Sequence, residues 1–553
     1  MSHVTPDDAR RAASLMLLRD GDAGLEVLML RRAERDGDLR SGACVFPGGV
    51  LDPADREAHA FCVGPDDRSA SARLGLPEGG LDYLIAAVRE SFEEVGLLLA
   101  LDAAGAPFDV ARHAEALHPW RDRLQAGEAS MAALCRAFDL RLDLRGLRYF
   151  SHWLTPPGLP KRFDTRFFVV PAPAGQVARA DLGEAVELMW TTPRAALDKA
   201  AEYKLLPVTR RTLMELSAFD AAAAVHGHAE RRTEVPLVMP RRARTRRGPQ
   251  IVLPDEHAYA EIARLDPDGS RPASAEIVAG VAVRLSPRIV RVTAPNPGVM
   301  TGPGTNSYLV GDPDAREWAL IDPGPRDDEH LRAILAAAPG PITRILVTHT
   351  HVDHSPGAAA LAQATGAALI GRPAPAGSSQ DRSFRPQHQP VHGDRLAIGE
   401  DTTLRVLHTP GHASNHLCYL LEQEKTLFTG DQVMQGSTVV INPPDGDMGA
   451  YLRALEALLG EDLEWLAPGH GFLVARPHEV LRALIRHRLK REALVLQALR
   501  AHGPASAAAL VPAVYVDVPA ARHPIAERSL LAHLLKLRDD GAAAEAGGVW
   551  SAR

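Results

Sequence analysis

His349-Thr350-His351-Val352-Asp353-His354 is the stretch of this chain that says most about its fold. It follows the apolar run 342–347, which is typical of a buried strand, and it precedes the small-residue stretch 356–364, which favours the start of a helix. Four ligand-type side chains therefore share one strand-to-helix loop. Imidazole nitrogens and carboxylate oxygens are ligands that zinc prefers. Because one tetrahedral ion cannot easily take all four from so short a loop, the stretch predicts a site for two metal ions.

Further candidate ligands stand in glycine-containing turns on either side of this loop. They are Asp322 in Leu-Ile-Asp-Pro-Gly, His412 in Thr-Pro-Gly-His, Asp431 in Phe-Thr-Gly-Asp and His470 in Ala-Pro-Gly-His-Gly. In residue type, order and spacing these motifs resemble the metallo-β-lactamase superfamily. The stretches 296–298, 304–310 and 409–416 resemble its β-lactamase-like endoribonuclease and glyoxalase II-like branch, over about residues 284–553.

This resemblance implies an αββα sandwich that holds two Zn²⁺ ions, or Mn²⁺ or Fe²⁺ in their place. By position, His349, His351 and His412 would hold one metal, Asp353, His354 and His470 would hold the other, and Asp431 would bridge them. Asp322 would anchor the loop and orient its histidines. His416 is either a structural histidine or a substrate contact. Since a metal pair brings the pKa of a bound water to about 7, we expect hydrolysis, with Asp353 and Asp431 as catalytic carboxylates. The site does not specify the bond.

A second cluster of candidate ligands lies in the first half of the chain. Glu90, Glu93 and Glu94 are spaced so that their carboxylates share one helical face. Such crowding costs stability unless a cation is bound, and Mg²⁺ or Mn²⁺ suits oxygen ligands. The alternative is a solvated acidic face. Because Phe46-Pro47-Gly48-Gly49 precedes the helix, the pattern resembles the Nudix box, which binds a metal-diphosphate.

Residues 28–32, which include Arg31 and Arg32, and residues 42–49 resemble the coenzyme A diphosphatase signature, and 160–168 and 190–193 are similar to its peroxisomal subgroup. The resemblance implies an α/β/α sandwich in which Glu93 and Glu94 ligate the metal and Glu90 ligates it or acts as base. Arg89 would orient a carboxylate, while Gly48 and Gly49 would let the backbone approach the phosphates.

This half departs from the family pattern. An insert, about residues 51–80, separates the glycines from the helix, and Leu81 stands where the box has a glutamate, with Glu78 and Asp82 nearby. Ser91 replaces an aliphatic residue. The domain is therefore either an active diphosphatase or a degenerate nucleotide-binding module.

The length of the chain and the patterns along the rest of it predict the domain organisation. A chain of 553 residues is too long for one core. We expect a Nudix-like domain over 5–260, a linker over 261–283, the metallo-β-lactamase fold over 284–480 and a winged-helix domain over 481–553. Helical patterns at 477–499 and 530–537, then a glycine turn and short strands, suggest the last of these, as a lid over the metal site. The basic run 241–247 favours a solvated loop over a contact with nucleic acid or phosphates.

Composition excludes some partners. A net charge of −7 gives no global attraction to nucleic acid or membrane, and no apolar run could span a bilayer. Four scattered cysteines fit a reducing, cytoplasmic location. We therefore predict a bifunctional metal-dependent hydrolase that cuts a thioester, ester or phosphodiester at one site and a diphosphate at the other. A small, acyl-coenzyme A-like substrate is expected. The alternative is a single-strand endoribonuclease with a nucleotide-sensing Nudix module.

Overall fold

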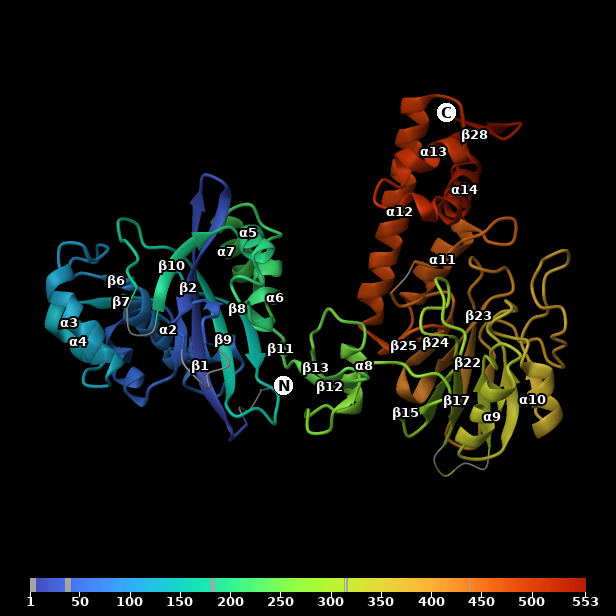
Figure 1. Ribbon diagram of the computed structural model, residues 1–553, viewed down its shortest axis with the longest axis horizontal. Helices are drawn as coiled ribbons and strands as arrows, with labels where there is room; N and C mark the ends of the chain where they lie inside the picture. Colours follow the sequence, from blue (N-terminus) through green and yellow to red (C-terminus); the bar gives the residue numbers. More distant parts are fainter. Residues whose placement is uncertain (1–5, 35–40, 181–184, 313, 315–316, 437) are drawn as a thin grey trace. The chain divides into compact units, whose positions relative to one another are not determined.

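The computed structural model describes residues 6–34, 41–180, 185–312, 314, 317–436 and 438–553. The expected domain start at residue 5 lies outside these residues. The chain is an α/β protein of two compact units, residues 1–240 and 241–553 (Figure 1). Each unit has a hydrophobic core of its own.

The first unit is built on an eight-stranded mixed sheet with the order β10-β2-β1-β9-β8-β11, to which β3 and β4 add short pairings. Its central strand β1 pairs antiparallel with β2 and β4 and parallel with β9. The strands are β1 (Ala9–Gly21), β2 (Gly24–Arg32), β3 (Cys44–Val45), β4 (Gly48–Val50), β8 (Arg148–Leu154), β9 (Arg162–Pro171), β10 (Ala185–Thr191) and β11 (Leu237–Val238).

Helices cover both faces of this sheet (Figure 1). Helix α2 (Gly80–Val95) packs on one face, because alternate residues of β1, Leu15 and Leu17, point into the same core as its Ile85 and Val88. The other face carries α5 (Pro193–Asp198), α6 (Pro207–Leu216) and α7 (Ala222–Arg231). These layers confirm the expected α/β/α sandwich.

The insert before α2 is folded into this unit. Residues 51–80 contain η1 (Pro53–Phe61), β5 (Cys62–Val63) and α1 (Asp67–Leu74). Ala58, Ala70 and Leu74 join the same core as α2. A second excursion after α2 adds β6 (Ala100–Leu101), α3 (Ala114–Gln125), α4 (Met131–Phe138) and β7 (Arg141–Asp143), and β5, β7 and β6 form a small sheet.

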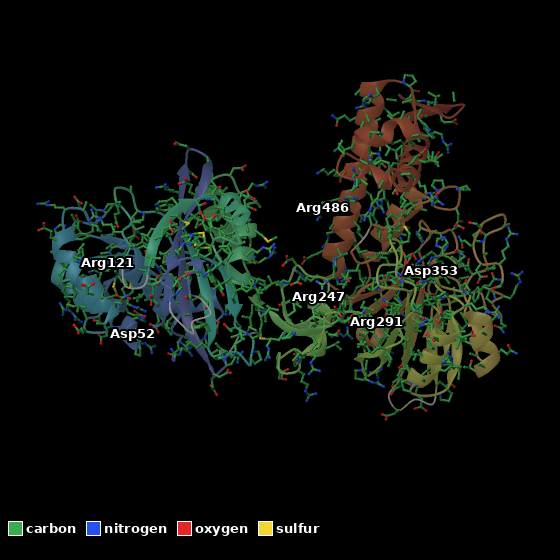
Figure 2. All side chains as sticks on the ribbon, in the orientation of Figure 1. Asp52, Arg121, Arg247, Arg291, Asp353 and Arg486 are labelled. Atoms are coloured by element: carbon green, nitrogen blue, oxygen red, sulfur yellow. The ribbon has the colours of Figure 1, made fainter. Side chains whose placement is uncertain are left out.

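The second unit begins with a small sheet where the sequence suggested a basic loop and a linker. Strands β12 (Arg241–Thr245), β13 (Gly248–Val252) and β14 (Ala273–Ser274) pair with one another, and α8 (Tyr259–Leu265) packs against them. Arg291, labelled in Figure 2, is buried and donates two hydrogen bonds, of 2.6 and 2.9 Å, to Glu261 of α8. The linker expected over 261–283 therefore contains structure that is anchored to the following domain.

Two six-stranded sheets follow, each with its strands in chain order. A core of side chains from both sheets lies between them. On the outside, α9 (Asp328–Ala337) and α10 (Ala358–Thr365) pack on the first sheet, and α11 (Met448–Leu458) with the start of α12 (Pro477–His502) packs on the second. This is the expected αββα sandwich. The first sheet is β15 (Ala282–Ser286), β16 (Ile289–Thr293), β17 (Asn306–Gly311), β18 (Trp318–Ile321), β19 (Ile342–Leu346) and β20 (Ala368–Ile370), and the second is β21 (Arg395–Ala397), β22 (Thr403–His408), β23 (Leu417–Leu421), β24 (Thr426–Gly430), β25 (Trp465–Pro468) and β26 (Val474–Ala475), with η2 (Glu422–Glu424) between β23 and β24.

The C-terminal part is a small helical domain with a three-stranded sheet. The end of α12 packs with α13 (Ala507–Val514) and α14 (His523–Asp539) around Val495, Leu534 and Trp550. Strands β27 (Ala505–Ser506), β28 (Ala543–Ala546) and β29 (Val549–Ala552) complete it, with η3 (Ala520–Arg522) before α14. Helices, glycine turn and short strands occur in the order that the sequence predicted. Within the described residues, no helix is both long and apolar enough to cross a membrane.

Candidate functional site

The seven candidate metal ligands converge at one end of the two large sheets. Their ligand atoms form two sets in which all atoms lie within 4.8 Å of one another: His349, His351, His412 and Asp431 in one, and Asp353, His354 and His470 in the other. The loop after β19 supplies both sets, and the loops after β22, β24 and β25 supply His412, Asp431 and His470. Residues up to 121 positions apart in sequence meet there only because the strand ends meet.

Short distances link the two sets. Nδ1 of His351 lies 2.9 Å from Nε2 of His349 and 3.0 Å from Nε2 of His412. The Asp431 carboxylate reaches both sets, because its Oδ2 lies 3.6 Å from Nε2 of His412 and its Oδ1 lies 3.3 Å from Nε2 of His470. Asp431 is thus the side chain whose carboxylate lies close to both sets.

Outer contacts orient the ligands. Asp322 adopts φ +51, in the left-handed region that residues other than glycine seldom occupy. Its carboxylate accepts hydrogen bonds of 2.7 Å from the backbone N–H and the hydroxyl of Thr348, and lies 2.8 Å from Nδ1 of His354. Asp322 therefore fixes the start of the metal loop and leaves Nε2 of His354 facing the site.

Histidines from the other loops are held in the same way. Nδ1 of His412 lies 2.8 Å from the carbonyl oxygen of Val440, and Nδ1 of His470 lies 3.2 Å from that of Gly304. The buried Arg488 of α12 donates to the adjacent carbonyl of Val439. The long helix that leads into the C-terminal domain thus supports the loop behind His412.

His416 has a structural position. It is fully buried, and its Nε2 accepts a 3.2 Å hydrogen bond from the backbone N–H of Asp431. Its Nδ1 lies 3.0 Å from the hydroxyl of Thr409. Of the two roles left open for His416, this geometry favours positioning Asp431 over touching a substrate.

The electrostatics differ between the two sets. Burial and the neighbouring His354 lower the pKa of His349 well below its usual value, and burial with His412 lowers the pKa of His351 to about 4. Both imidazoles are neutral at neutral pH and have lone pairs for a metal. Burial opposes the charging of His470, but the carboxylates of Asp431 and Asp353 raise the pKa of His470 to about 9.

The buried atoms fit a metal pair. Nε2 of His354 and Oδ1 of Asp431 are buried, lie 3.4 Å apart, and have no hydrogen-bond partner among the described residues. Both are ligand atoms for a divalent ion. A Cβ on Gly469 would meet Oδ1 of Asp431 and Cε1 of His354 at 2.8 Å each. The space between the two ligands therefore requires glycine at this position.

The glutamates of α2 form a different arrangement. Arg89 donates to Glu90 at 2.8 Å and to Glu93 at 3.2 Å, while Glu94 accepts a 2.8 Å hydrogen bond from the backbone N–H of Gly48. Burial, opposed by Arg89, raises the pKa of Glu93 to about 7. Within the described residues these glutamates do not form a set as tight as those of the second unit.

Comparison with known proteins identifies these domains. Residues 300–470 match the metallo-beta-lactamase superfamily model, 64–208 match the NUDT19 Nudix domain and 506–550 match the beta-lactamase associated winged helix domain. The beta-lactamase-like protein 2 homolog of Drosophila melanogaster is 31% identical over 271 residues, which are 47% of this chain and 90% of that protein. The chain belongs to the metallo-β-lactamase superfamily. It joins a hydrolase domain of this fold to a Nudix hydrolase domain.

Other relatives are named for their substrates. An atrochrysone carboxyl ACP thioesterase of Aspergillus chevalieri is 36% identical over 222 residues, 39% of this chain and 67% of that protein. The chain spans about two thirds of the length of the first curated relatives that it matches, 65% and 67%. A solved Nudix hydrolase from Alicyclobacillus acidocaldarius is 29% identical, with a TM-score of 0.33, over 40% of this chain and 96% of that one.

The Nudix helix has a carboxylate partner that sequence reasoning missed. Asp55, in η1 of the insert, is 1% exposed and accepts from Nε of Arg89 at 2.8 Å and from Nη2 at 3.3 Å. Leu81, at the position of the box glutamate, is instead buried in the apolar core. The nearby candidates pair elsewhere, Glu78 with Arg56 and Asp82 with His59. The only signal in the sequence was a carboxylate inside a family-specific insert, 34 residues before its partner.

Of the glycines and arginines predicted to contact phosphates, Gly48, Gly49 and Arg32 lie close to the glutamates of α2. A Cβ on Gly49 would meet Oε1 of Glu90 at 2.4 Å, so the absence of a side chain at Gly49 leaves room for the Glu90 carboxylate. Arg32 lies 4.0 Å from Glu94, whereas Arg31 lies 3.0 Å from Glu187 of β10. Contacts of Gly48, Gly49, Arg31 and Arg32 with phosphates stay a prediction.

Proposed function

We propose that the chain is a bifunctional metal-dependent hydrolase, with a dinuclear zinc site in the second unit and a Mg²⁺ or Mn²⁺ Nudix site in the first. The observation that carries the first part is the pair of buried ligand atoms on His354 and Asp431 that form no hydrogen bond among the described residues. In this proposal His349, His351 and His412 hold one ion, Asp353, His354 and His470 hold the other, and Asp431 contacts both. Mn²⁺ or Fe²⁺ could replace zinc at the same ligands.

The protein groups then have separate tasks. A bound metal pair supplies a hydroxide nucleophile and a positive charge for the developing oxyanion. Asp353, whose side chain is 21% exposed, is the most accessible carboxylate of the site and faces the incoming substrate. Its hydrogen bond from Thr305, at 3.1 Å, keeps it in place. Asp431, held through its backbone by His416, keeps the two halves of the site at a fixed separation.

The substrate proposed for this site is a thioester, with esters and phosphodiesters as less favoured classes. Support comes from relatives whose names describe acyl-carrier-protein thioesterases. An acyl-coenzyme A-like metabolite combines a thioester with a diphosphate, so one molecule offers a bond to each domain. We also propose a cytoplasmic location, because the four cysteines of the chain are free thiols.

For the Nudix domain, we propose that Glu93 and Glu94 ligate Mg²⁺ and that Glu90 ligates it or acts as base. Asp55, Glu90 and Glu93 surround the buried guanidinium of Arg89. The raised pKa of Glu93 reflects burial among these carboxylates. A divalent cation would relieve their mutual repulsion, which is the chemical reason why the donor set fits an ion.

The test is a hydrolysis panel of acyl-coenzyme A, coenzyme A, hydroxyacyl thioesters, lactones and single-stranded RNA. The wild type should release free thiol from acyl-coenzyme A, and should release phosphopantetheine and adenosine 3′,5′-bisphosphate from coenzyme A when Mg²⁺ is present. Asp431→Ala should remove only the first activity and Glu93→Gln only the second. RNA cleavage without thioester cleavage, together with nucleotide binding but no diphosphate turnover, would establish the alternative endoribonuclease with a sensing Nudix module.

A further inference from the structure

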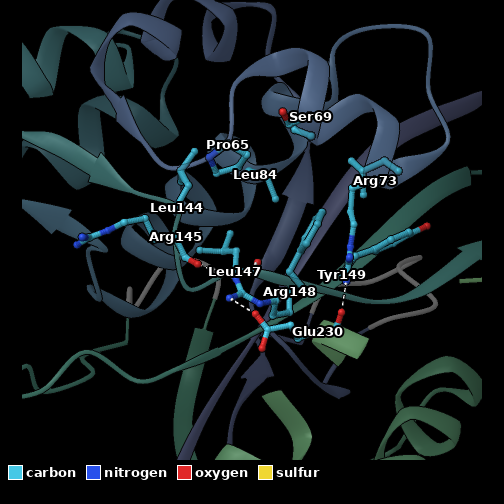
Figure 3. Close-up of a pocket in the computed structure, with 13 residues that line it drawn as sticks. Pro65, Ser69, Arg73, Leu84, Leu144, Arg145, Leu147, Arg148, Tyr149 and Glu230 are labelled. Carbon is cyan, nitrogen blue, oxygen red and sulfur yellow. Dashed lines mark hydrogen bonds and ion pairs between the residues drawn. The ribbon is translucent and has the colours of Figure 1, made fainter. Parts of the chain in front are cut away.

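A cavity of about 280 Å³ opens into the Nudix unit beside the N-terminal half of α2 (Figure 3). Its walls include Leu74 of α1, Leu84 of α2, Leu144, Tyr149 and Phe168. All five side chains are buried members of the main hydrophobic core of this unit. The cavity is therefore an opening onto the core itself, where a ligand would displace water from apolar surface.

The rim of this cavity is cationic. Arg145 donates two hydrogen bonds of 2.8 Å to Asp143, and Arg148 donates one of 2.9 Å to the carboxylate of Glu230. Two of the three rim arginines are thus neutralised by carboxylates, and the third is Arg73.

Arg73 has a different environment. Through Nη2 alone it donates to the carbonyl oxygens of Ala229, at 2.9 Å, and Glu230, at 3.1 Å. Across the described ranges, no carboxylate forms an ion pair with Arg73. Its Nε and Nη1 groups form no hydrogen bond there either. These main-chain contacts hold the guanidinium at the mouth of the cavity while its charge stays uncompensated (Figure 3).

An apolar cavity with one uncompensated guanidinium at its mouth suits a ligand with an apolar tail and an anionic head. Guanidinium binds carboxylates through paired, charge-assisted hydrogen bonds. At roughly 30 Å³ for each water-sized group, the volume holds about nine such groups. We propose that this cavity binds a small anionic amphiphile, with a carboxylate head at Arg73 and a tail of about seven carbons against Leu84 and Phe168.

This site is separate from both hydrolytic sites. The residues that line the cavity include none of Arg89, Glu90, Glu93 and Glu94, and no residue of the second unit. The proposal therefore does not depend on the proposed function. Octanoate is a suitable probe, and octanol and acetate separate the contributions of tail and head.

The experiment is calorimetric titration of the full-length protein with octanoate. Binding should be saturable, and octanol and acetate should each bind at least tenfold more weakly. Arg73→Gln should weaken octanoate at least tenfold, while Arg68→Gln, a matched change on the exposed side of α1 and outside the cavity, should change the affinity less than twofold. Circular dichroism checks the fold of each variant.

Two more variants test whether octanoate binds in this cavity or at the metal centre. Ser69 is exposed at the cavity mouth, so Ser69→Phe should block binding by filling the opening while the charge of Arg73 is kept. Asp431→Ala should leave octanoate binding unchanged, because the carboxylate is not bound as a reaction product at the metal centre. Equal affinity in wild type, Arg73→Gln and Ser69→Phe, loss of binding in Asp431→Ala, or no saturable binding would each overturn the proposal.

Discussion

Asp55→Asn tests whether the insert supplies the carboxylate that positions the Nudix arginine. The side chain of Asp55 is 1% exposed, and that of Arg89 is 10% exposed. Breaking a buried ion pair by removing one charge costs about 3–5 kcal/mol. Asparagine keeps one acceptor oxygen, so the expected loss is about 3 kcal/mol, at the lower end of that range. Since Arg89 also holds Glu90 and Glu93, diphosphate cleavage should fall at least tenfold.

Leu81→Glu is the matched change, because it tests the opposite explanation of the same site. If the box glutamate were simply missing, restoring it should improve catalysis. The structure predicts the reverse, because Leu81 is 3% exposed and packs in the core. Losing its burial costs about 2 kcal/mol, and a buried unpaired carboxylate costs several more. Asp82→Asn, which changes only a partly exposed pair with His59, should cost less than about 1 kcal/mol.

The assay is hydrogen exchange of the α2 amides, read by mass spectrometry in the full-length protein, since a multidomain chain does not unfold in two states. A loss of 3 kcal/mol corresponds to about a 100-fold fall in protection for Asp55→Asn. Mg²⁺-dependent diphosphatase activity is measured in parallel. A gain of activity in Leu81→Glu, or unchanged protection in Asp55→Asn, would refute the assignment of Asp55.

Three other predictions concern charge and space. The pKa of Glu93 in the folded protein is raised from 4.5 to about 7, so the loss of stability caused by its buried charge grows as pH rises from about 4.5 to 7. In the metal-free protein, the α2 amides of Glu93→Gln should therefore be better protected than those of wild type at pH 8 and no better protected at pH 4. Hydrogen exchange corrected for pH measures this. With the pKa of His470 at about 9, Zn²⁺ uptake by chelator-treated protein at pH 7 should release protons, and a calorimetric heat independent of buffer ionisation would contradict this. Gly469→Ala should lower zinc affinity at least tenfold because its Cβ would meet Asp431 and His354 at 2.8 Å, whereas Gly460→Ala, whose Cβ would meet only a carbonyl oxygen at 3.4 Å, should not.

The sequence predicted the fold classes, and the side chains that it named as candidate metal ligands lie together in the structure. Metal ligands in a strand-to-helix loop keep their spacing whatever the rest of the domain does, so His349 to His354 could be recognised directly. Both sandwiches have strands whose apolar runs are bounded by glycine turns, which made β19 and its neighbours recognisable.

Contacts between distant segments that carry no recognisable motif could not be predicted. Asp55 accepts from Arg89 across 34 residues of sequence, and no local pattern connects the two. The role of His416 depended on which backbone N–H it faces, which only the folded chain determines. The basic run 241–247 contributed to β12 because Ala243 points into a small core with Val252 and Ile262, and the run of arginines concealed that apolar position.

The central claim is that the second unit holds a metal pair bridged by Asp431. Elemental analysis of the full-length protein, purified without chelator, tests it most directly. The account predicts close to two transition-metal ions per chain in the wild type, and fewer in Asp431→Ala, whose bridging carboxylate is lost, with no change on Glu93→Gln in the other unit. Wild-type protein without bound metal, or Asp431→Ala protein with the same two ions, would contradict it.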